Sequence, residues 1–196
     1  MCINIKTSIL AFVIGTISGL ILNKSENKEN KIIGKFIIFY TMVQLFEALI
    51  YNNNKEIDSR LLLINLGFQG LVLMLLLNDY IPINKMYIYI TGLIAAFIFY
   101  KSIHSEFVQA STTNGMEWNF IDNITGSVLV IMYITMFICI LDNNKKLDKI
   151  NKMGIFLFIT LIISFIIKEL KIICNVNRPS MWCLSSAMVA PIILFI

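Results

Sequence analysis

The sequence predicts an all-α protein, a polytopic bundle of transmembrane helices that forms one integral membrane domain over residues 1–196. The first observation is composition: 58% of the residues are hydrophobic, only 14% are charged, and the mean hydropathy is +0.79. A soluble domain carries about 25% charged residues, and its core could not bury so many apolar side chains. The second observation is patterning, since the lysines fall in short runs between long apolar segments, as in integral membrane proteins.

Long apolar runs give the number of predicted helices. A helix needs roughly 20 mostly apolar residues to cross the hydrocarbon core of a bilayer, and about seven runs are candidates by that rule, of which the first, sixth and seventh are short. These candidate spans are residues 7–22, 32–51, 61–77, 83–101, 124–141, 153–167 and 182–196. Each must be helical, because unpaired backbone groups are too costly in lipid and the runs are too continuously apolar for barrel strands.

Each span has features of its own. The first contains Gly15 and Gly19 in "GTISG", a small-xxx-small pattern that predicts close packing against another helix. The third and fifth have the most continuous apolar runs, and the fourth is followed by the longest connection, residues 102–123. The sixth is expected to continue through "KELKIIC", with Lys168 and Lys171 reaching toward the headgroups. The seventh opens with "WCLSSAMVAP".

The basic residues predict an orientation. The first, third and fifth connections, with the adjoining span ends, hold nine of the 16 Lys and Arg residues, and the other face holds seven. Cytoplasmic loops are usually the richer in Lys and Arg. This small excess favours an N-terminus outside and a C-terminus in the cytosol.

Polar side chains within the second and third spans form the candidate site. Gln44 and Glu47 are three residues apart, and Tyr40 lies one turn earlier on the same side of the helix. Asn65 and Gln69 are four residues apart on the next span and also share a face. A carboxylate in a transmembrane span is costly and normally faces the bundle interior or water. We therefore expect Gln44 and Glu47 to face Asn65 and Gln69.

Helix alternation adds residues from later in the chain. Consecutive spans run in opposite directions, so the end of the second, the start of the third, the end of the fourth and the start of the seventh share one membrane half. The predicted polar cavity in that half therefore includes Trp182, Ser185 and Ser186. His104, in the 102–123 connection, lies near the same half, and His104 and Glu47 are the candidate pH-responsive groups.

Each of these residues also has a structural interpretation. Glu47 lies about one turn before the end of its predicted span, where headgroup water could solvate it at lower cost. Asn65 and Gln69 could instead form hydrogen bonds that hold helices together. His104 could occupy an interfacial loop, and Trp182 could be an interfacial anchor.

Cysteine and histidine content limits the metal and redox chemistry. Cys174 and Cys183 would form a disulfide if their loop faces an oxidising compartment. The chain has one histidine and no C-x-x-C pair, so we expect no metal site. The lysines do not form the extended basic stripe that nucleic-acid binding requires, so the expected partners are the lipid bilayer and further copies of the chain.

Known sequence motifs for catalysis and cofactor binding are missing. The chain has no G-x-S-x-G, P-loop or H-E-x-x-H motif, so we predict that it is not an enzyme. Seven spans with an outside N-terminus would look like microbial rhodopsins and seven-helix receptors. However, the last span, "WCLSSAMVAPIILFI", lacks the lysine that would hold retinal, so no cofactor is expected. The alkaline ceramidase and progestin-receptor-like group uses several histidines for zinc, and this chain has one.

Two stretches carry a resemblance to a known group of proteins. "MVQLFEALIY" in the second span and "SMWCLSSAMVAP" at the start of the last resemble small multi-pass membrane proteins of unknown function from giant DNA viruses and protists. The likeness covers these two stretches and the helix count. It implies no activity, so no residue role follows from it.

The sequence as a whole predicts a multi-pass membrane protein with a polar cavity in one membrane half. It would act as a small transporter, a channel-like protein or a receptor-like module, with Glu47 as the responsive group and an unidentified ligand. The alternative is a structural or assembly protein of a viral or cellular membrane, in which the polar residues only join helices. An intramembrane enzyme is the remote third reading.

Overall fold

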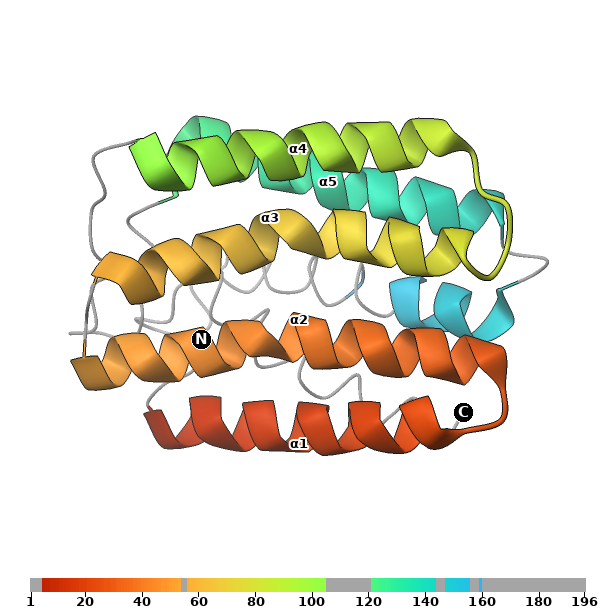
Figure 1. Cartoon of the computed structure of the whole chain (residues 1–196), viewed down its shortest axis with the longest axis horizontal. Helices are drawn as coiled ribbons and strands as arrows, with labels where there is room; N and C mark the ends of the chain where they lie inside the picture. The colour runs from red at the N-terminus through yellow and green to blue at the C-terminus, as the bar shows by residue number, and fades with distance from the viewer. Residues whose placement is uncertain (1–4, 54–55, 105–120, 144–146, 156–158, 160–196) are drawn as a thin grey trace.

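The computed structural model describes residues 5–53, 56–104, 121–143, 147–155 and 159, and it is all-α over them (Figure 1). A short helical segment covers residues 148–155. The five long helices are α1 (Ile5–Lys24), α2 (Lys28–Asn53), α3 (Glu56–Asn78), α4 (Lys85–His104) and α5 (Asn123–Asp142). Each of these five is long and apolar enough to cross a membrane, which confirms the first five predicted spans.

The last two predicted spans are covered only at one edge. The sixth, 153–167, begins inside the helical segment 148–155, so this helix starts five residues earlier than predicted. The remainder of that span, apart from residue 159, and the whole of the seventh span, 182–196, lie outside the described residues. The predicted disulfide between Cys174 and Cys183 lies outside them as well.

Helix ends differ from the predicted spans because helices continue past the apolar run and end at capping groups. The side chain of Asn27 accepts hydrogen bonds from the backbone N–H groups of Glu29, at 2.8 Å, and Asn30, at 3.3 Å. This cap lets α2 begin at Lys28, four residues before the predicted span. The predicted fourth span, 83–101, ends three residues too early, because α4 continues to His104.

The helices form an up-and-down array (Figure 1). α1 packs on α2, α2 on α3, and α3 on α4, while α5 packs against both α3 and α4. The segment 148–155 lies beside the start of α2, where the carboxylate of Glu29 accepts a hydrogen bond of 2.7 Å from the backbone N–H of Ile150. Because the first N–H groups of a helix have no partner within it, Glu29 caps this segment from another helix.

Glycines bring the backbones of α1 and α2 into contact. Gly15 and Gly19 are buried against α2, as the "GTISG" pattern predicts. A Cβ atom on Gly34 would lie 2.5 Å from the carbonyl oxygen of Gly19 and 2.6 Å from the backbone nitrogen of Asn23. Both neighbours are backbone atoms, so no side chain can move aside to make room.

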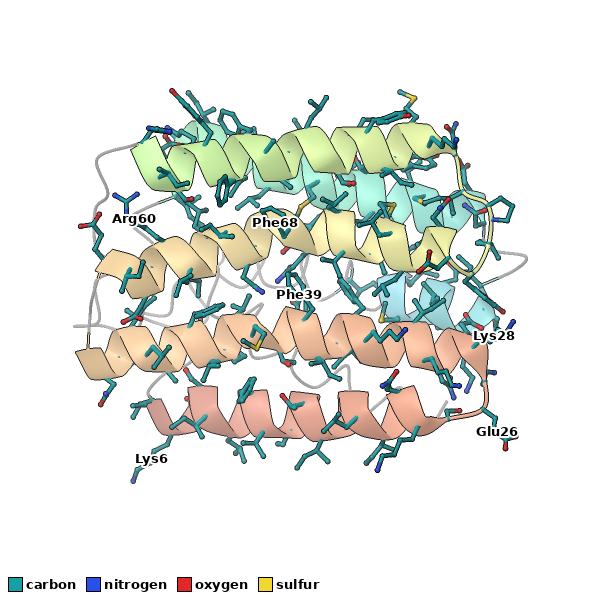
Figure 2. All side chains as sticks on the ribbon, viewed as in Figure 1. Lys6, Glu26, Lys28, Phe39, Arg60 and Phe68 are labelled. Carbon is teal, nitrogen blue, oxygen red and sulfur yellow. The ribbon has the colours of Figure 1, made fainter. Side chains whose placement is uncertain are left out.

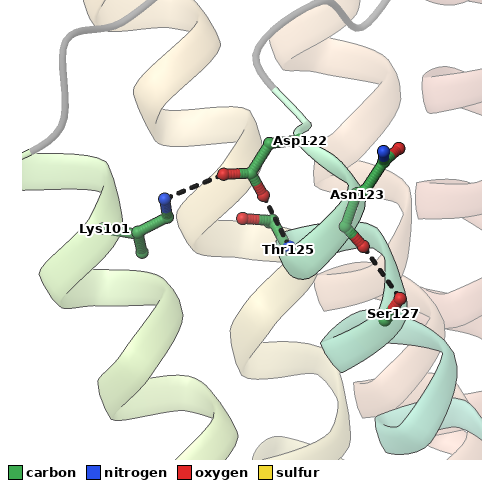
Figure 3. A network of polar contacts seen from close by, with 5 residues as sticks. All are labelled: Lys101, Asp122, Asn123, Thr125 and Ser127. Atoms are coloured by element: carbon green, nitrogen blue, oxygen red, sulfur yellow. Dashed lines mark hydrogen bonds and ion pairs between the residues drawn. The ribbon is translucent and has the colours of Figure 1, made fainter.

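The α4–α5 pair is joined at both of its ends. At one end the Lys101 ammonium contacts the Asp122 carboxylate at 2.8 Å, and the same carboxylate accepts a 2.6 Å hydrogen bond from the backbone N–H of Thr125 (Figure 3). At the other end the Tyr87 hydroxyl donates to Asp142. The hydrogen bond from Lys101, followed by those from Thr125, lowers the pKa of Asp122 from 3.8 to about 2.

The first prediction concerns the contact between α1 and α2. We expect Gly34→Ala to destabilise the fold by about 1–3 kcal/mol, because the added methyl group forces the two backbones apart. Thermal unfolding in detergent, followed by circular dichroism, measures the loss. Gly92→Ala is the matched control, since its Cβ would meet only Leu71 Cδ1 at 3.9 Å. Equal unfolding temperatures for Gly34→Ala and the wild type would contradict the close contact.

The second prediction concerns pH. A carboxyl group whose pKa is lowered on folding stabilises the fold above its unfolded pKa, and the contribution disappears as the pH falls toward the folded pKa. Asp122→Asn keeps a good helix cap but removes the charge. We expect the wild type to exceed this variant in stability by about 0.2–1 kcal/mol at pH 7, since the Asp122 side chain is 49% exposed. This difference in stability should decrease progressively as the pH falls from 4 to about 2.

Chemical unfolding in a non-ionic detergent at pH 7, 4 and 2.5 measures this difference. The control is Glu26→Gln, which removes an exposed carboxylate from the α1–α2 turn. A wild-type advantage that stays constant from pH 7 to pH 2.5 would contradict the assignment to Asp122.

Candidate functional site

Polar side chains follow one side of α2 into the bundle. Tyr40, Gln44 and Glu47 recur at the spacing of one helix face, and the Glu47 side chain is 0% exposed. Gln44 is buried as well, and the half-buried Tyr40 packs its ring against Phe36, with the ring centroids 5.9 Å apart. The carboxyl group of Glu47 therefore lies inside the protein, and in this structure it is not a solvated surface group.

A second polar row follows one side of α3. Asp58, Asn65 and Gln69 are spaced by seven and four residues, which places them on one helix face, and all three are buried. Asp58 is 7% exposed although it lies in the first turn of the helix. The polar seam, as the term is used below, comprises five buried residues and two half-buried tyrosines of α2, α3 and α5: Gln44, Glu47, Asp58, Asn65, Gln69, Tyr40 and Tyr133.

A chain of hydrogen bonds joins three helices through the polar seam. The Tyr133 hydroxyl on α5 donates to Gln69 Oε1 at 2.7 Å, and Gln69 Nε2 donates to Asn65 Oδ1 at 3.3 Å. Asn65 Nδ2 then donates to the backbone carbonyl of Phe39 on α2, at 3.3 Å. This amide relay satisfies both buried amide groups within the protein, as a bundle in lipid requires.

The predicted facing of Gln44 and Glu47 with Asn65 and Gln69 stays a prediction, and the relay shows where Asn65 contacts α2. Asn65 meets α2 at Phe39, eight residues before Glu47, which is about 12 Å along a helix axis. Because only residues 54–55 separate α2 from α3, the last two turns of α2 lie level with the first two turns of α3. Glu47 is therefore level with the part of α3 that begins at Asp58. Helix faces were predictable from spacing, but the register between the helices was not.

Two residues of the polar seam were missed by the sequence analysis. Tyr133 lies in the apolar run of the fifth span, and a phenol hydroxyl buried there needs a partner, which was the available signal. Asp58 lies outside the predicted third span, but it shares a helix face with Asn65 and Gln69. Within the described part of the chain, Asp58 Oδ2 is buried and accepts no hydrogen bond. A buried carboxylate oxygen without a donor marks a place for water, a proton or a cation.

The polar seam extends from the α2–α3 end of the bundle to just past its middle. Glu47 lies about 9 Å from the end of α2, and Gln69 lies about 20 Å from the start of α3, a helix of 23 residues. Fully buried apolar side chains lie beside the seam, among them Ile50, Leu62 and Leu66, and others fill the far end: Ile33, Phe36, Leu73, Met74 and Leu77. The seam is therefore a polar strip within a mostly apolar interior.

Other predicted site residues lie elsewhere. His104 is the last residue of α4 and not part of a loop; it is exposed, and its ring lies against Tyr100 with the centroids 4.6 Å apart. The predicted cavity residues Trp182, Ser185 and Ser186 lie outside the described residues. Among the residues that the structure describes, no cluster of three or more His, Cys, Asp or Glu side chains could hold a metal ion.

Comparisons of the chain with family models, with curated proteins and with solved structures found no match. The resemblance of "MVQLFEALIY" and "SMWCLSSAMVAP" to viral and protist membrane proteins stays a prediction.

The third prediction concerns the amide relay. Tyr133→Phe removes one hydroxyl and leaves the buried Gln69 Oε1 without its donor, so we expect a loss of about 0.5–2 kcal/mol. Thermal unfolding in detergent measures it. Tyr89→Phe is the matched control, because the Tyr89 side chain is 67% exposed and its hydroxyl can bond to water. A Tyr133→Phe variant as stable as Tyr89→Phe would show that the relay does not hold α5 to α3.

Proposed function

We propose that the chain is a multi-pass membrane protein that binds a proton or a small cation at Glu47. The polar seam would be the route to that residue from one membrane surface, in a small transporter, a channel-like protein or a receptor-like module. The observation that carries this proposal is the complete burial of the Glu47 side chain within a helix long and apolar enough to cross a membrane.

Energetics supports a role for this carboxylate. A charged side chain costs about 2.5–3.5 kcal/mol at the centre of a bilayer, even on the scale that gives the lowest values, and less toward the end of a helix, where Glu47 lies. Such residues are rare within transmembrane helices and normally serve an ion or proton pathway. An apolar residue at position 47 would avoid that cost. Asp58 adds a second buried carboxylate on the same half of the bundle, with an oxygen that accepts no hydrogen bond from the described residues.

The position of Glu47 favours access from the end of the bundle that carries the α2–α3 turn. The residue lies about 9 Å from the end of α2, so an ion entering from that end would travel the shorter distance. Fully buried apolar side chains, among them Ile33, Phe36 and Leu73, separate Glu47 from the other end.

A second candidate function is a structural or assembly role, and the amide relay favours it. Hydrogen bonds from Tyr133 through Gln69 and Asn65 to the Phe39 carbonyl join helices, and they need no ligand to do so. In this alternative Glu47 would also serve only to hold helices together.

The fourth prediction tests the role of Glu47. Wild type, Glu47→Gln and Glu26→Gln are reconstituted in matched proteoliposomes after each is shown to be monodisperse in detergent, and H⁺, Na⁺ and K⁺ fluxes are recorded. We expect wild-type flux for one of these ions and loss to the level of empty vesicles with Glu47→Gln, because glutamine keeps the shape but cannot ionise. Glu26→Gln removes an exposed carboxylate and should keep the flux.

The opposite results are equally informative. Equal flux in the wild type and Glu47→Gln, or no flux for any of the three ions, would contradict ion binding and leave the structural alternative. In that case Glu47→Leu should unfold at a lower temperature than the wild type, while Glu47→Gln, which keeps the hydrogen-bonding capacity, should be nearly as stable.

A further inference from the structure

The opposite end of the bundle carries a row of lysines on the outer side of α2. Lys28, Lys31 and Lys35 are spaced by three and four residues, so they lie on one side of the helix, and all three are exposed. Figure 2 labels Lys28 where α2 begins, with Glu26 in the adjoining turn. Lys24, the last residue of α1, is exposed at the same end. The three α2 residues are called the lysine row below.

The charge of the lysine row is not neutralised by the residues that the structure describes. Glu29 lies in the same helical turns but points inward, where its carboxylate binds the backbone N–H of Ile150. In the described ranges, none of the three lysines forms an ion pair. At the other end of the bundle, by contrast, Arg60 is paired with Glu56 and Lys101 with Asp122.

The position of the lysine row matches the headgroup layer of a bilayer. It starts where α2 begins and rises by about 10 Å along the helix, from Lys28 to Lys35. The headgroup region is about 5–7 Å thick on each side of the hydrocarbon core, and a lysine can lift its ammonium group several ångströms toward the surface. All three ammonium groups can therefore reach the level of the lipid phosphates, while nearby apolar side chains such as Leu20 and Ile21 are exposed for acyl chains.

We propose that the lysine row binds the headgroups of anionic phospholipids. The end of the bundle with the α1–α2 turn would then face the leaflet that is richer in acidic lipid. A membrane lipid fits better than a soluble phosphate compound, because the row extends along a transmembrane helix instead of gathering in a loop. Ion pairs involve Arg60 and Lys101 at one end of the bundle and Lys152, with Asp148, at the other, but none of them involves the lysine row in the described ranges. The proposal does not depend on ion binding at Glu47.

The fifth prediction is a lipid titration of the full-length protein. The protein in neutral detergent is titrated with dioleoyl phosphatidylglycerol or dioleoyl phosphatidylcholine, and bound lipid is counted by native mass spectrometry. We expect the wild type to prefer the anionic lipid. The triple variant Lys28→Gln, Lys31→Gln, Lys35→Gln should lose most of that preference, roughly 100-fold in relative affinity, since each lysine near the surface contributes about one kcal/mol.

The control is a triple variant with the same change of net charge at three lysines outside the row: Lys6→Gln, Lys85→Gln and Lys149→Gln. It should keep the preference, and circular dichroism should show both triples folded. Inorganic phosphate at the lipid concentration should not compete, which separates a lipid site from a simple phosphate site. Equal binding of the two lipids by the wild type, an equal loss in both triples, or full competition by phosphate would each overturn the proposal.

Discussion

The register of α2, α3 and α5 along the bundle axis depends on the amide relay. Gln69 and Asn65 are buried on α3, whose other side chains are mostly apolar, and each amide must find partners within the protein because none exist in lipid. Tyr133 and the Phe39 carbonyl supply those partners from the two neighbouring helices. Sliding α3 by one turn, about 5.4 Å, would break the hydrogen bonds to both neighbours at once. The level of Glu47 within the bundle follows from this register.

Polar groups at the helix ends act differently from those in the middle. The Lys101–Asp122 and Tyr87–Asp142 contacts lie at opposite ends of the α4–α5 pair, where water competes for the same groups. Such exposed contacts add little stability, but they bring the start of α5 next to the end of α4 across the long connection between them. Between α1 and α2, close packing at glycines sets the distance between the helices, and charged groups do not. The helices of the bundle are thus held by hydrogen bonds in the interior, by an ion pair at one end of the α4–α5 pair, and by close packing between α1 and α2.

Much of this architecture was predictable from the sequence. Apolar length located five spans, because the cost of exposing backbone groups to lipid leaves few alternatives to helices. The 3.6-residue period correctly grouped Gln44 with Glu47 and Asn65 with Gln69. The alignment of two helices was not predictable: Asn65 meets Phe39 on α2, and no local pattern encodes that contact. Tyr133 was missed because it resembled an ordinary aromatic residue of an apolar span. Asp58 was missed because it lies outside the apolar run of the third span.

The capping of Ile150 by Glu29 has a consequence for biosynthesis. These two residues are 121 positions apart in the chain, so the carboxylate leaves the ribosome long before the backbone group that it binds. This hydrogen bond can therefore form only after α3, α4 and α5 have been synthesised. The contact between the start of α2 and the segment 148–155 thus cannot be completed until residue 150 has left the ribosome.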